Sequence, residues 1–237
     1  GYRYPGSEGS ALSGVDMEIA AGEKVALIGG TGSGKSTLVR LLTGLSAPTE
    51  GELLFDGKPV SEISEQRIRD NVSCVLQKDT IFSGTIGENV AAGRQVSDEE
   101  INAAIEDARL AEFVEEQKEK IAYPVTQRGG NLSGGQKQRL AIARAILKPA
   151  AIYIFDDSFS ALDFKTDAKL RRALTKYTEN AVVLIVAQRV STIMNAEQII
   201  VLDEGKIVGK GTHKELLKTC PEYREIAESQ LSKEELA

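Results

Sequence analysis

The sequence has little cysteine, little histidine and no long apolar run. Two cysteines and one histidine occur among its 237 residues. Cys74 and Cys220 stand far apart and lack the paired spacing of a metal site or a redox couple, so we expect two reduced thiols. The longest apolar runs, such as residues 181–187, are much shorter than the ~20 residues that a membrane-spanning helix needs. We therefore expect no membrane span within this chain.

A surplus of basic charge is also absent. The formal net charge is −6, so the chain lacks the basic field that attracts a nucleic acid backbone, and we expect no nucleic acid partner. The first residues do not follow the charged-then-apolar layout of a signal peptide, and the abrupt start at Gly1 suggests a piece of a longer polypeptide. Apolar residues make up 41% and charged residues 27%, which is ordinary for a globular chain. We expect one folded domain over residues 1–237.

What is present is an alternation of short apolar strands and amphipathic helices. Buried strands are predicted at residues 24–28, 72–77, 152–155, 182–187 and 198–203. Helices with apolar residues three or four positions apart are predicted at residues 35–45, 98–117, 135–147 and 167–177. This alternation is typical of an α/β fold with a parallel sheet.

Two further features complete the predicted organisation. Residues 81–149 contain one helical stretch after another and almost no strand character, so we expect a helical subdomain with about these bounds. Residues 51–60 and 206–211 resemble hairpin arms, the second after a turn at Glu204-Gly205. They indicate a small antiparallel β subdomain in addition to the parallel sheet.

The predicted strand at 24–28 leads into a glycine-rich segment with the phosphate-binding pattern G-x-x-x-x-G-K-[ST]. The segment consists of Gly29, Gly30, Thr31, Gly32, Ser33, Gly34, Lys35 and Ser36, and Thr37 follows it. Glycines allow backbone N–H groups to surround a β-phosphate, and the N-terminus of the next helix adds its dipole. Lys35 would bridge the β- and γ-phosphates, and the hydroxyl of Ser36 would bind Mg²⁺. The segment therefore predicts ATP and Mg²⁺ as ligands.

An acidic residue stands where such a site needs one. Asp156 follows the apolar run 152–155, so a buried strand would deliver its carboxylate to the carboxyl edge of the sheet, where α/β sheets bind ligands. As in other P-loop NTPases, we expect Asp156 to hold Mg²⁺ through water. The structural alternative, in which Asp156 only caps the next turn, stays open.

A third segment gives the sequence its family resemblance. Leu132 is followed by Ser133, Gly134, Gly135, Gln136 and a predicted helix. Serine and two glycines at a helix N-terminus present backbone N–H groups and a positive dipole end to an anion. The segment resembles the signature sequence of the ABC transporter family. The other segments that carry the resemblance, in the family's order, are the phosphate loop, Gln77, residues 160–163 and residues 187–189.

The resemblance implies a P-loop ABC ATPase core with a helical subdomain that carries the signature. The signature would contact ATP held by a second ABC ATPase domain, so that two ATP molecules join two domains and hydrolysis separates them. This cycle would drive a transmembrane partner. The resemblance also implies that Gln77 is a catalytic residue and a Mg²⁺ contact, and that Tyr4 stacks on adenine, with Tyr2 as a competitor. A plain surface or core tyrosine remains the alternative for Tyr4.

Two segments, residues 82–90 and 211–217, resemble ABC exporters whose ATPase domain is fused to membrane helices. The resemblance implies a membrane domain in the same polypeptide, preceding Gly1, and a place at the cytoplasmic face of a membrane, with the isolated domain soluble. Residues 126–130 would contact intracellular coupling helices, although Gln127 stands where the family more often has Glu. The transported substrate is not encoded in this domain.

Two residues depart from the family's catalytic pattern. Asp157 stands where active members usually have the Glu that polarises the attacking water, and Gln188 where they usually have a His that contacts the γ-phosphate. Asp is one methylene shorter than Glu, and Gln carries no positive charge. Because the signature is intact, the pattern suggests the degenerate-site half of a heterodimeric exporter, with slow turnover of its own. The single histidine, His213, is not expected to be catalytic.

Other interpretations stay open. The chain could be the ATPase domain of a self-sufficient homodimeric exporter. It could also be a soluble ABC ATPase of DNA repair or translation, although the acidic charge and the exporter-like segments count against this interpretation. A third alternative is a regulatory ATP-binding module without turnover.

Overall fold

The computed structural model describes residues 1–77 and 80–232, which form two compact units. The first unit comprises Gly1–Val72, Ala151–Asp157 and Ala181–Ala237. The second unit comprises Ser73–Ala150 and Ser158–Asn180. Each unit is therefore assembled from segments that are far apart in the sequence.

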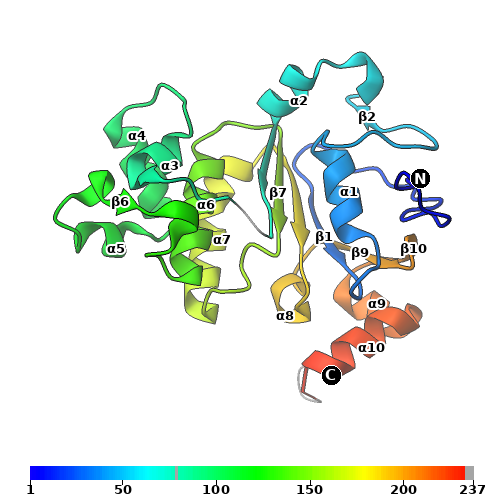
Figure 1. The fold of residues 1–237 in the computed structure, drawn as a ribbon. Coiled ribbons are helices and arrows are strands. Elements are labelled where there is room, and N and C mark those ends of the chain that lie inside the picture. Colours follow the sequence, from blue (N-terminus) through cyan, green and yellow to red (C-terminus); the bar gives the residue numbers. More distant parts are fainter. Residues whose placement is uncertain (78–79, 233–237) are drawn as a thin grey trace. The chain divides into compact units, whose positions relative to one another are not determined.

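A mostly parallel sheet forms the centre of the first unit (Figure 1). Its strands, in spatial order, are β10 (Lys206–Gly211), β9 (Gln198–Asp203), β1 (Lys24–Ile28), β8 (Val182–Val186) and β7 (Ile152–Asp156). β1 pairs in parallel with β8 and with β9, and β7 pairs in parallel with β8. β10 pairs antiparallel with β9 at the edge. The predicted α/β fold with a parallel sheet is confirmed.

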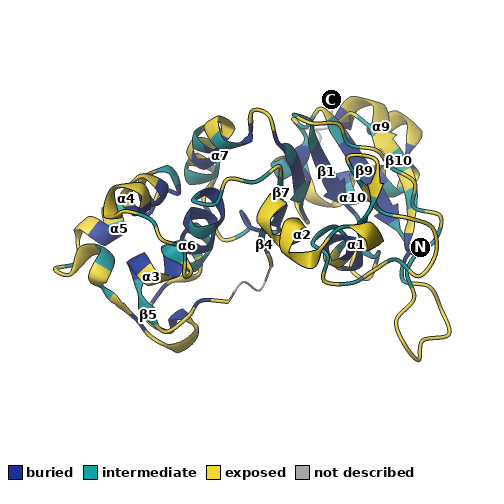
Figure 2. Ribbon diagram, turned by 90° about the horizontal axis from the view of Figure 1, so that it is seen from above, coloured by how far each residue is buried: buried dark blue, intermediate teal, exposed yellow. Residues whose placement is uncertain are grey.

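The strands form because runs of valine, isoleucine and leucine fit a sheet that is covered on both faces. The four consecutive residues of β1 from Val25 to Ile28 are all buried, as the dark blue of this strand shows in Figure 2. Asp156 ends β7 opposite Val186, the last residue of β8, and Leu27 of β1 also pairs with Val186. The carboxyl ends of β1, β8 and β7 therefore lie together at one edge of the sheet.

Helix α1 (Lys35–Leu42) follows β1 and buries Leu38, Val39 and Leu41. The prediction of a helix to residue 45 was too long. Gly44 takes a φ of 71°, and the N–H of Leu45 donates to the carbonyl of Arg40 at 2.9 Å, which ends the helix as a Schellman motif does.

A small hairpin lies in the predicted first arm. β2 (Leu54–Phe55) pairs antiparallel with β3 (Lys58–Pro59) around Asp56-Gly57, whose φ angles of 50° and 72° suit a tight hairpin turn. A 3₁₀ turn, η1 (Val60–Glu62), and helix α2 (Glu65–Asn71) follow. The second arm is also confirmed, because β10 follows the turn at Glu204-Gly205 and pairs with β9.

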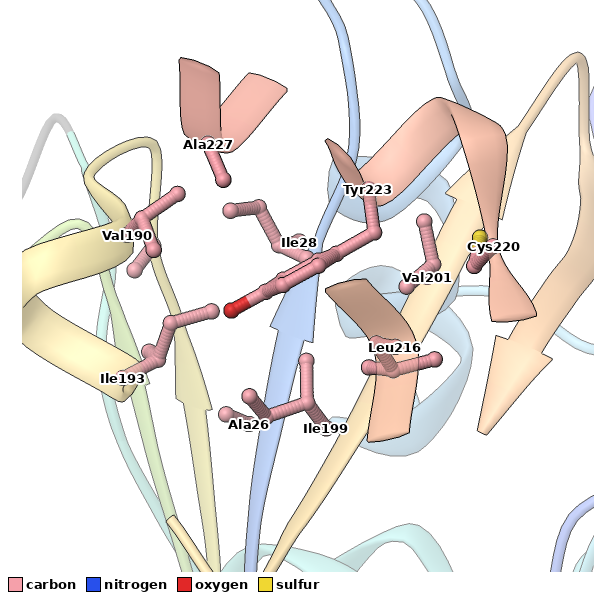
Figure 3. Close-up of a cluster of buried hydrophobic side chains, with 11 residues drawn as sticks. Ala26, Ile28, Val190, Ile193, Ile199, Val201, Leu216, Cys220, Tyr223 and Ala227 are labelled. Carbon is pink, nitrogen blue, oxygen red and sulfur yellow. The ribbon is translucent and has the colours of Figure 1, made fainter. Parts of the chain in front are cut away.

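Three helices near the C-terminus share one apolar cluster, drawn in Figure 3. They are α8 (Val190–Ile193), α9 (His213–Thr219) and α10 (Pro221–Gln230). The ring of Tyr223 lies in the middle of the cluster and is fully buried, and its hydroxyl is 2.7 Å from Nδ1 of His213. His213 is thus buried and contacts this cluster through Tyr223.

The second unit is mainly helical. Its helices are α3 (Ile86–Ala91), α4 (Asp98–Asp107), α5 (Ala111–Glu115), α6 (Gly134–Ile146) and α7 (Phe164–Thr178), with the 3₁₀ turns η2 (Lys120–Ala122) and η3 (Gln127–Gly129). α3 and α4 pack against α6, whose residues from Leu140 to Ala143 are all buried. Strand β4 (Val72–Val75) begins at the last residue of the first unit's opening segment and is shorter than predicted.

Two details of the second unit refine the prediction. The expected single helix over 98–117 is broken between α4 and α5, because Arg109 takes a φ of 59° and the N–H of Leu110 donates to the carbonyl of Ile105 at 2.9 Å. The stretch expected to have almost no strand character contains one short antiparallel pair among its described residues, β5 (Gly84–Thr85) with β6 (Pro124–Val125). No helix among the described residues combines the length and apolar character needed to cross a bilayer.

Candidate nucleotide-binding site

The phosphate loop, residues 29–36, connects β1 to the first turn of α1. Gly32 and Gly34 have φ angles of 83° and 103°, in the left-handed region that favours glycine. A Cβ atom on Gly34 would lie 2.7 Å from Cδ2 of Leu12 and 2.9 Å from the carbonyl oxygen of Ala11. A Cβ atom on Gly32 would meet open space. The loop is therefore tightly packed on one side and open on the other, as a phosphate cradle requires.

Helix α1 begins without a side-chain cap. Gly34 is its N-cap, and its first turn, which is fully described, contains no acidic residue. The first N–H groups of a helix have no partner within the helix, and the helix dipole adds positive potential there. Since no side chain caps this end, a phosphate group can use these N–H groups.

The side chain of Lys35 folds back over the loop. Its ammonium donates to the carbonyl oxygens of Gly29 and Gly30, both at 2.8 Å, and to Oγ of Ser33 at 3.3 Å. Burial lowers the pKa of Lys35 below its usual value of 10.5, and Asp156 and Asp157 oppose this shift because their negative charges favour the ammonium form. Phosphate oxygens are better partners for this ammonium than carbonyls, so an arriving phosphate can replace them.

Two carboxylates follow one another at the carboxyl edge of the sheet. Asp156 is buried at the end of β7, with 8% of its surface exposed. Asp157 takes a φ of 49°, and its N–H donates to the carbonyl oxygen of Val186 at 2.8 Å. This left-handed conformation, which few non-glycine residues adopt, turns the chain immediately after the strand.

The exposed residue Gln188 lies just beyond β8 and reaches Asp157. Its Nε2 donates to Oδ2 of Asp157 at 3.3 Å. The first unit therefore brings together Lys35, Asp156, Asp157 and Gln188, which the sequence places in three distant segments. The two residues that depart from the family pattern are in contact with each other.

Tyr4 contacts the helix that follows the phosphate loop. Its hydroxyl lies 3.0 Å from Oγ1 of Thr37, which is buried, and 41% of its surface is exposed. The ring of Tyr2 packs edge-on against Tyr4, with 4.9 Å between the ring centroids. The ring of Tyr4 is thus anchored at one end and exposed on another side, whereas Tyr2 is less exposed and pairs with Leu12.

The remaining predicted site residues lie in the second unit. Gln77 is exposed and precedes the undescribed residues 78–79. Ser133 is the N-cap of α6 and forms a capping box with Gln136. The N–H of Gln136 donates to Oγ of Ser133 at 3.2 Å, and the N–H of Ser133 donates to Oε1 of Gln136 at 2.7 Å. Gly134 and Gly135 therefore stand in the first turn of a regular helix, as the anion-site interpretation requires.

The comparisons with known proteins agree with these observations. A family model described as "ABC transporter" matches residues 12–160. The chain belongs to this family.

An uncharacterised ABC transporter ATP-binding protein of Mycobacterium tuberculosis, Rv1273c, is 43% identical over 233 residues, which are 97% of this chain and 40% of that protein. An ATP-dependent lipid A-core flippase of Chromobacterium violaceum is 39% identical over 232 residues, which are 98% of this chain and 40% of the flippase. The structure of a bacterial Atm1-family ABC exporter with ATP bound matches 98% of this chain and 41% of its own chain, with a TM-score of 0.93 and 35% identity. The chain thus spans about two fifths of the length of these relatives.

The residues of this ABC transporter chain fit Mg²⁺ bound together with a nucleotide. Mg²⁺ prefers oxygen ligands and commonly uses one or two protein groups, with phosphates and water for the rest. Asp156 and the exposed hydroxyl of Ser36 are ligands of this kind. Among the described residues, no group of three or more acidic, histidine or cysteine side chains forms a self-sufficient metal site. A magnesium ion here would therefore depend on phosphate oxygens.

Two contacts of functional segments were missed by the sequence analysis. Gln138 lies two residues beyond Gln136, and its side chain donates to Oγ of Ser160 and accepts from the N–H of Ala161, at 3.1 and 3.0 Å. It therefore ties α6 to the segment 160–163 within the second unit. The position of Gln138 in the signature helix could have suggested a role. Gln230 of α10, which contacts the backbone of Gln188 and Val190, had no such signal.

Proposed function

We propose that this chain is the ATP-binding and ATP-hydrolysing domain of an ABC exporter, at the cytoplasmic face of a membrane. Residues 1–237 would be one nucleotide-binding domain, and residues of about 81–149 its helical subdomain. The contact of Gln188 with Asp157 carries the proposal, because Asp157 also interacts electrostatically with Lys35 of the phosphate loop. Similarity to an Atm1-family exporter and to a lipid A-core flippase supports the exporter class.

Each residue of the first unit would have one task in hydrolysis. Lys35 would exchange its carbonyl partners for β- and γ-phosphate oxygens, and Tyr4 would stack on adenine. Asp156 and Ser36 would hold Mg²⁺, which neutralises charge that develops on the phosphates. Asp157 would orient the attacking water and accept its proton, and Gln188 would donate a hydrogen bond to the γ-phosphate. Gln77 of the second unit would contact Mg²⁺ and the attacking water.

We propose that this site turns over slowly. In the family pattern the carboxylate is one methylene longer and its neighbour can carry a positive charge. Here a neutral amide holds the short carboxylate of Asp157 at 3.3 Å. The shorter side chain of Asp157 reaches less far toward the attacking water, and the neutral Gln188 stabilises the charge that develops on the γ-phosphate less than a histidine would.

The partner would be a second ABC ATPase domain, and the transmembrane domain would belong to the same polypeptide. The signature residues Ser133, Gly134, Gly135 and Gln136 would complete the competent site of that partner. A heterodimer explains why the signature is intact while the catalytic pair is altered. The chain's length, about two fifths of the relatives it matches, leaves room for membrane helices in the whole protein.

The test is ATP hydrolysis by the purified chain with Mg²⁺, measured at several protein concentrations because the active form would be a dimer. We expect Asp157→Glu combined with Gln188→His to raise turnover by about 10- to 100-fold, within the range of general base catalysis. Asp98→Glu makes the same chemical change on an exposed helix and should have no effect. Lys35→Ala should abolish turnover in both backgrounds. Rapid hydrolysis by the unmodified chain would instead support a self-sufficient homodimer.

A further inference from the structure

The last residue of helix α10, Gln230, contacts the segment that carries Gln188. Its Oε1 accepts a hydrogen bond from the N–H of Val190 at 2.8 Å. Its Nε2 donates to the carbonyl oxygen of Gln188 at 2.8 Å. One side-chain amide therefore pairs with two backbone groups that lie two residues apart, as a neighbouring strand would.

The rest of the segment is fixed at its ends. The N–H of Ala187 donates to the carbonyl oxygen of Leu27 at 3.0 Å, which holds the end next to the sheet. Val190 and Ile193 of α8 are buried in the cluster around Tyr223, to which Ala227 of α10 also belongs (Figure 3). Gln188 and Arg189 between these anchors are exposed. Gln230 holds this exposed stretch at the backbone.

We propose that Gln230 is a positioning residue for the ATPase reaction. By holding the backbone of residues 188–190, it directs the side chain of Gln188 toward Asp157. The inference rests on the proposed role of Gln188 at the γ-phosphate. Without Gln230, the exposed stretch would occupy additional conformations, and a smaller fraction of molecules would have Gln188 directed toward Asp157. The rate of hydrolysis would fall in proportion to that fraction.

The decisive variant is Gln230→Met, which keeps the length of the side chain and removes both hydrogen bonds. Gln230→Glu keeps an acceptor for the N–H of Val190 and removes the donor to Gln188. Glu228→Met, an exposed position on the same helix, is the matched control. The unmodified protein and these three variants are compared, each as the 237-residue chain.

The first readout does not depend on activity. We expect the amide hydrogen of Val190 to exchange with solvent at least about 10-fold faster in Gln230→Met, because its acceptor is lost. Gln230→Glu and Glu228→Met should leave this exchange near the value of the unmodified chain. Unchanged exchange in Gln230→Met would overturn the inference, whether or not the chain hydrolyses ATP.

The second readout separates positioning from simple support of the fold. We expect Gln230→Met to lower kcat about 5- to 20-fold while KM changes less than about twofold, since the phosphate loop itself is intact. In a Gln188→Ala background the same change should leave kcat unaltered. An equal loss of kcat in both backgrounds would show that Gln230 only supports the fold, and would overturn the inference. If the unmodified chain lacks turnover, the proposed function fails. The inference is then tested by the NMR resonance of the side-chain amide of Gln188, which should shift in Gln230→Met.

Discussion

Two helix N-termini of this chain have similar sequences and different local structures. Serine and glycine stand at the start of both α1 and α6, and neither helix has an acidic residue in its first turn, which is fully described in each case. The N-cap of α1 is Gly34, in a left-handed conformation with no side chain to cap the helix. The N-cap of α6 is Ser133, in an extended conformation with a complete capping box. The N-terminus of α1 therefore has no side-chain cap, whereas that of α6 is partly satisfied by its own side chains.

The difference indicates two ways to bind an anion. The N–H groups at α1 have no competing side chain, so the phosphate loop is organised for its ligand in advance. At α6 the capping box uses the N–H groups of Ser133 and Gln136, so an anion would be bound by those of Gly134 and Gly135. The signature helix is therefore stabilised by its own cap, whereas the phosphate loop depends on glycines in the left-handed region, which leave its backbone N–H groups accessible.

A comparison with the other capping boxes explains the choice of glutamine. Among the described residues, capping boxes at α3, α4 and α9 use Glu88, Glu100 and Glu215. The box at α6 uses the neutral Gln136. Glutamate stabilises a helix N-terminus through the dipole, but it also cancels the positive potential that attracts an anion. Glutamine keeps the cap and leaves the potential available.

The largest contrast is expected between alanine at Gly34 and alanine at Gly134. Gly34→Ala places a Cβ atom 2.7 Å from Leu12 in a backbone conformation that L residues rarely adopt, so it should cost on the order of 3 kcal/mol of unfolding free energy and abolish ATP binding. At Gly134 the nearest atom, Cβ of Ala161, would lie 3.8 Å away. Gly134→Ala should therefore change the unfolding free energy by less than about 1 kcal/mol. Urea denaturation measures the unfolding free energy of the two variants, and a fluorescent nucleotide measures their ATP binding. Equal destabilisation by the two variants would contradict the comparison.

A smaller effect on stability and a clear effect on function are expected at the signature. Gln136→Glu preserves the capping box, so the thermal midpoint should stay the same or rise slightly. It introduces a negative charge where a γ-phosphate would bind, so ATP-dependent dimerisation should weaken by about 10-fold or more. Ser133→Ala is the complementary variant, since it should cost about 1 kcal/mol of stability by removing the cap. Light scattering with ATP measures dimerisation, and calorimetry measures stability. If Gln136→Glu dimerises normally, the anion-site interpretation of this helix fails.

Much of the fold and of the candidate site could be predicted because short-range patterns determine them. The strand at 24–28 and the phosphate loop were placed correctly, since a run of buried apolar residues and a glycine pattern are both local signals. The ends of elements were less reliable, as at Gly44 and Arg109. There the backbone turns into the left-handed region, and nothing in the apolar periodicity announces that turn.

Contacts between distant segments were beyond the sequence. Asp157 and Gln188 were identified separately, and their hydrogen bond follows from the order of β7 and β8 in the sheet. Gln230 is a polar residue on an exposed helix end, and no local pattern distinguishes it from its neighbours. Only the shared apolar cluster of α8 and α10 brings it to the backbone of residues 188–190. Long-range packing, which periodicity does not encode, determined these contacts.

The smallest expected effect is a pH dependence that one of the two helix ends should have and the other should lack. Because burial lowers the pKa of Lys35 below 10.5, ATP affinity should fall as pH rises toward that lowered value. Lys35→Arg should bind ATP without this alkaline decline, since arginine stays charged. Residues 132–136 contain no titratable side chain, so a step that depends only on the signature should show no such decline.

The sign of the stability change provides an internal control for this measurement. A lysine whose pKa is lower in the folded chain binds fewer protons there than in the unfolded chain, so its contribution to stability rises as pH increases through the same range. Affinity and the Lys35 contribution to stability should thus change in opposite directions. A parallel fall of the thermal midpoint and of ATP affinity in the unmodified chain, repeated in Lys35→Arg, would show general alkaline unfolding and would remove Lys35 as the cause.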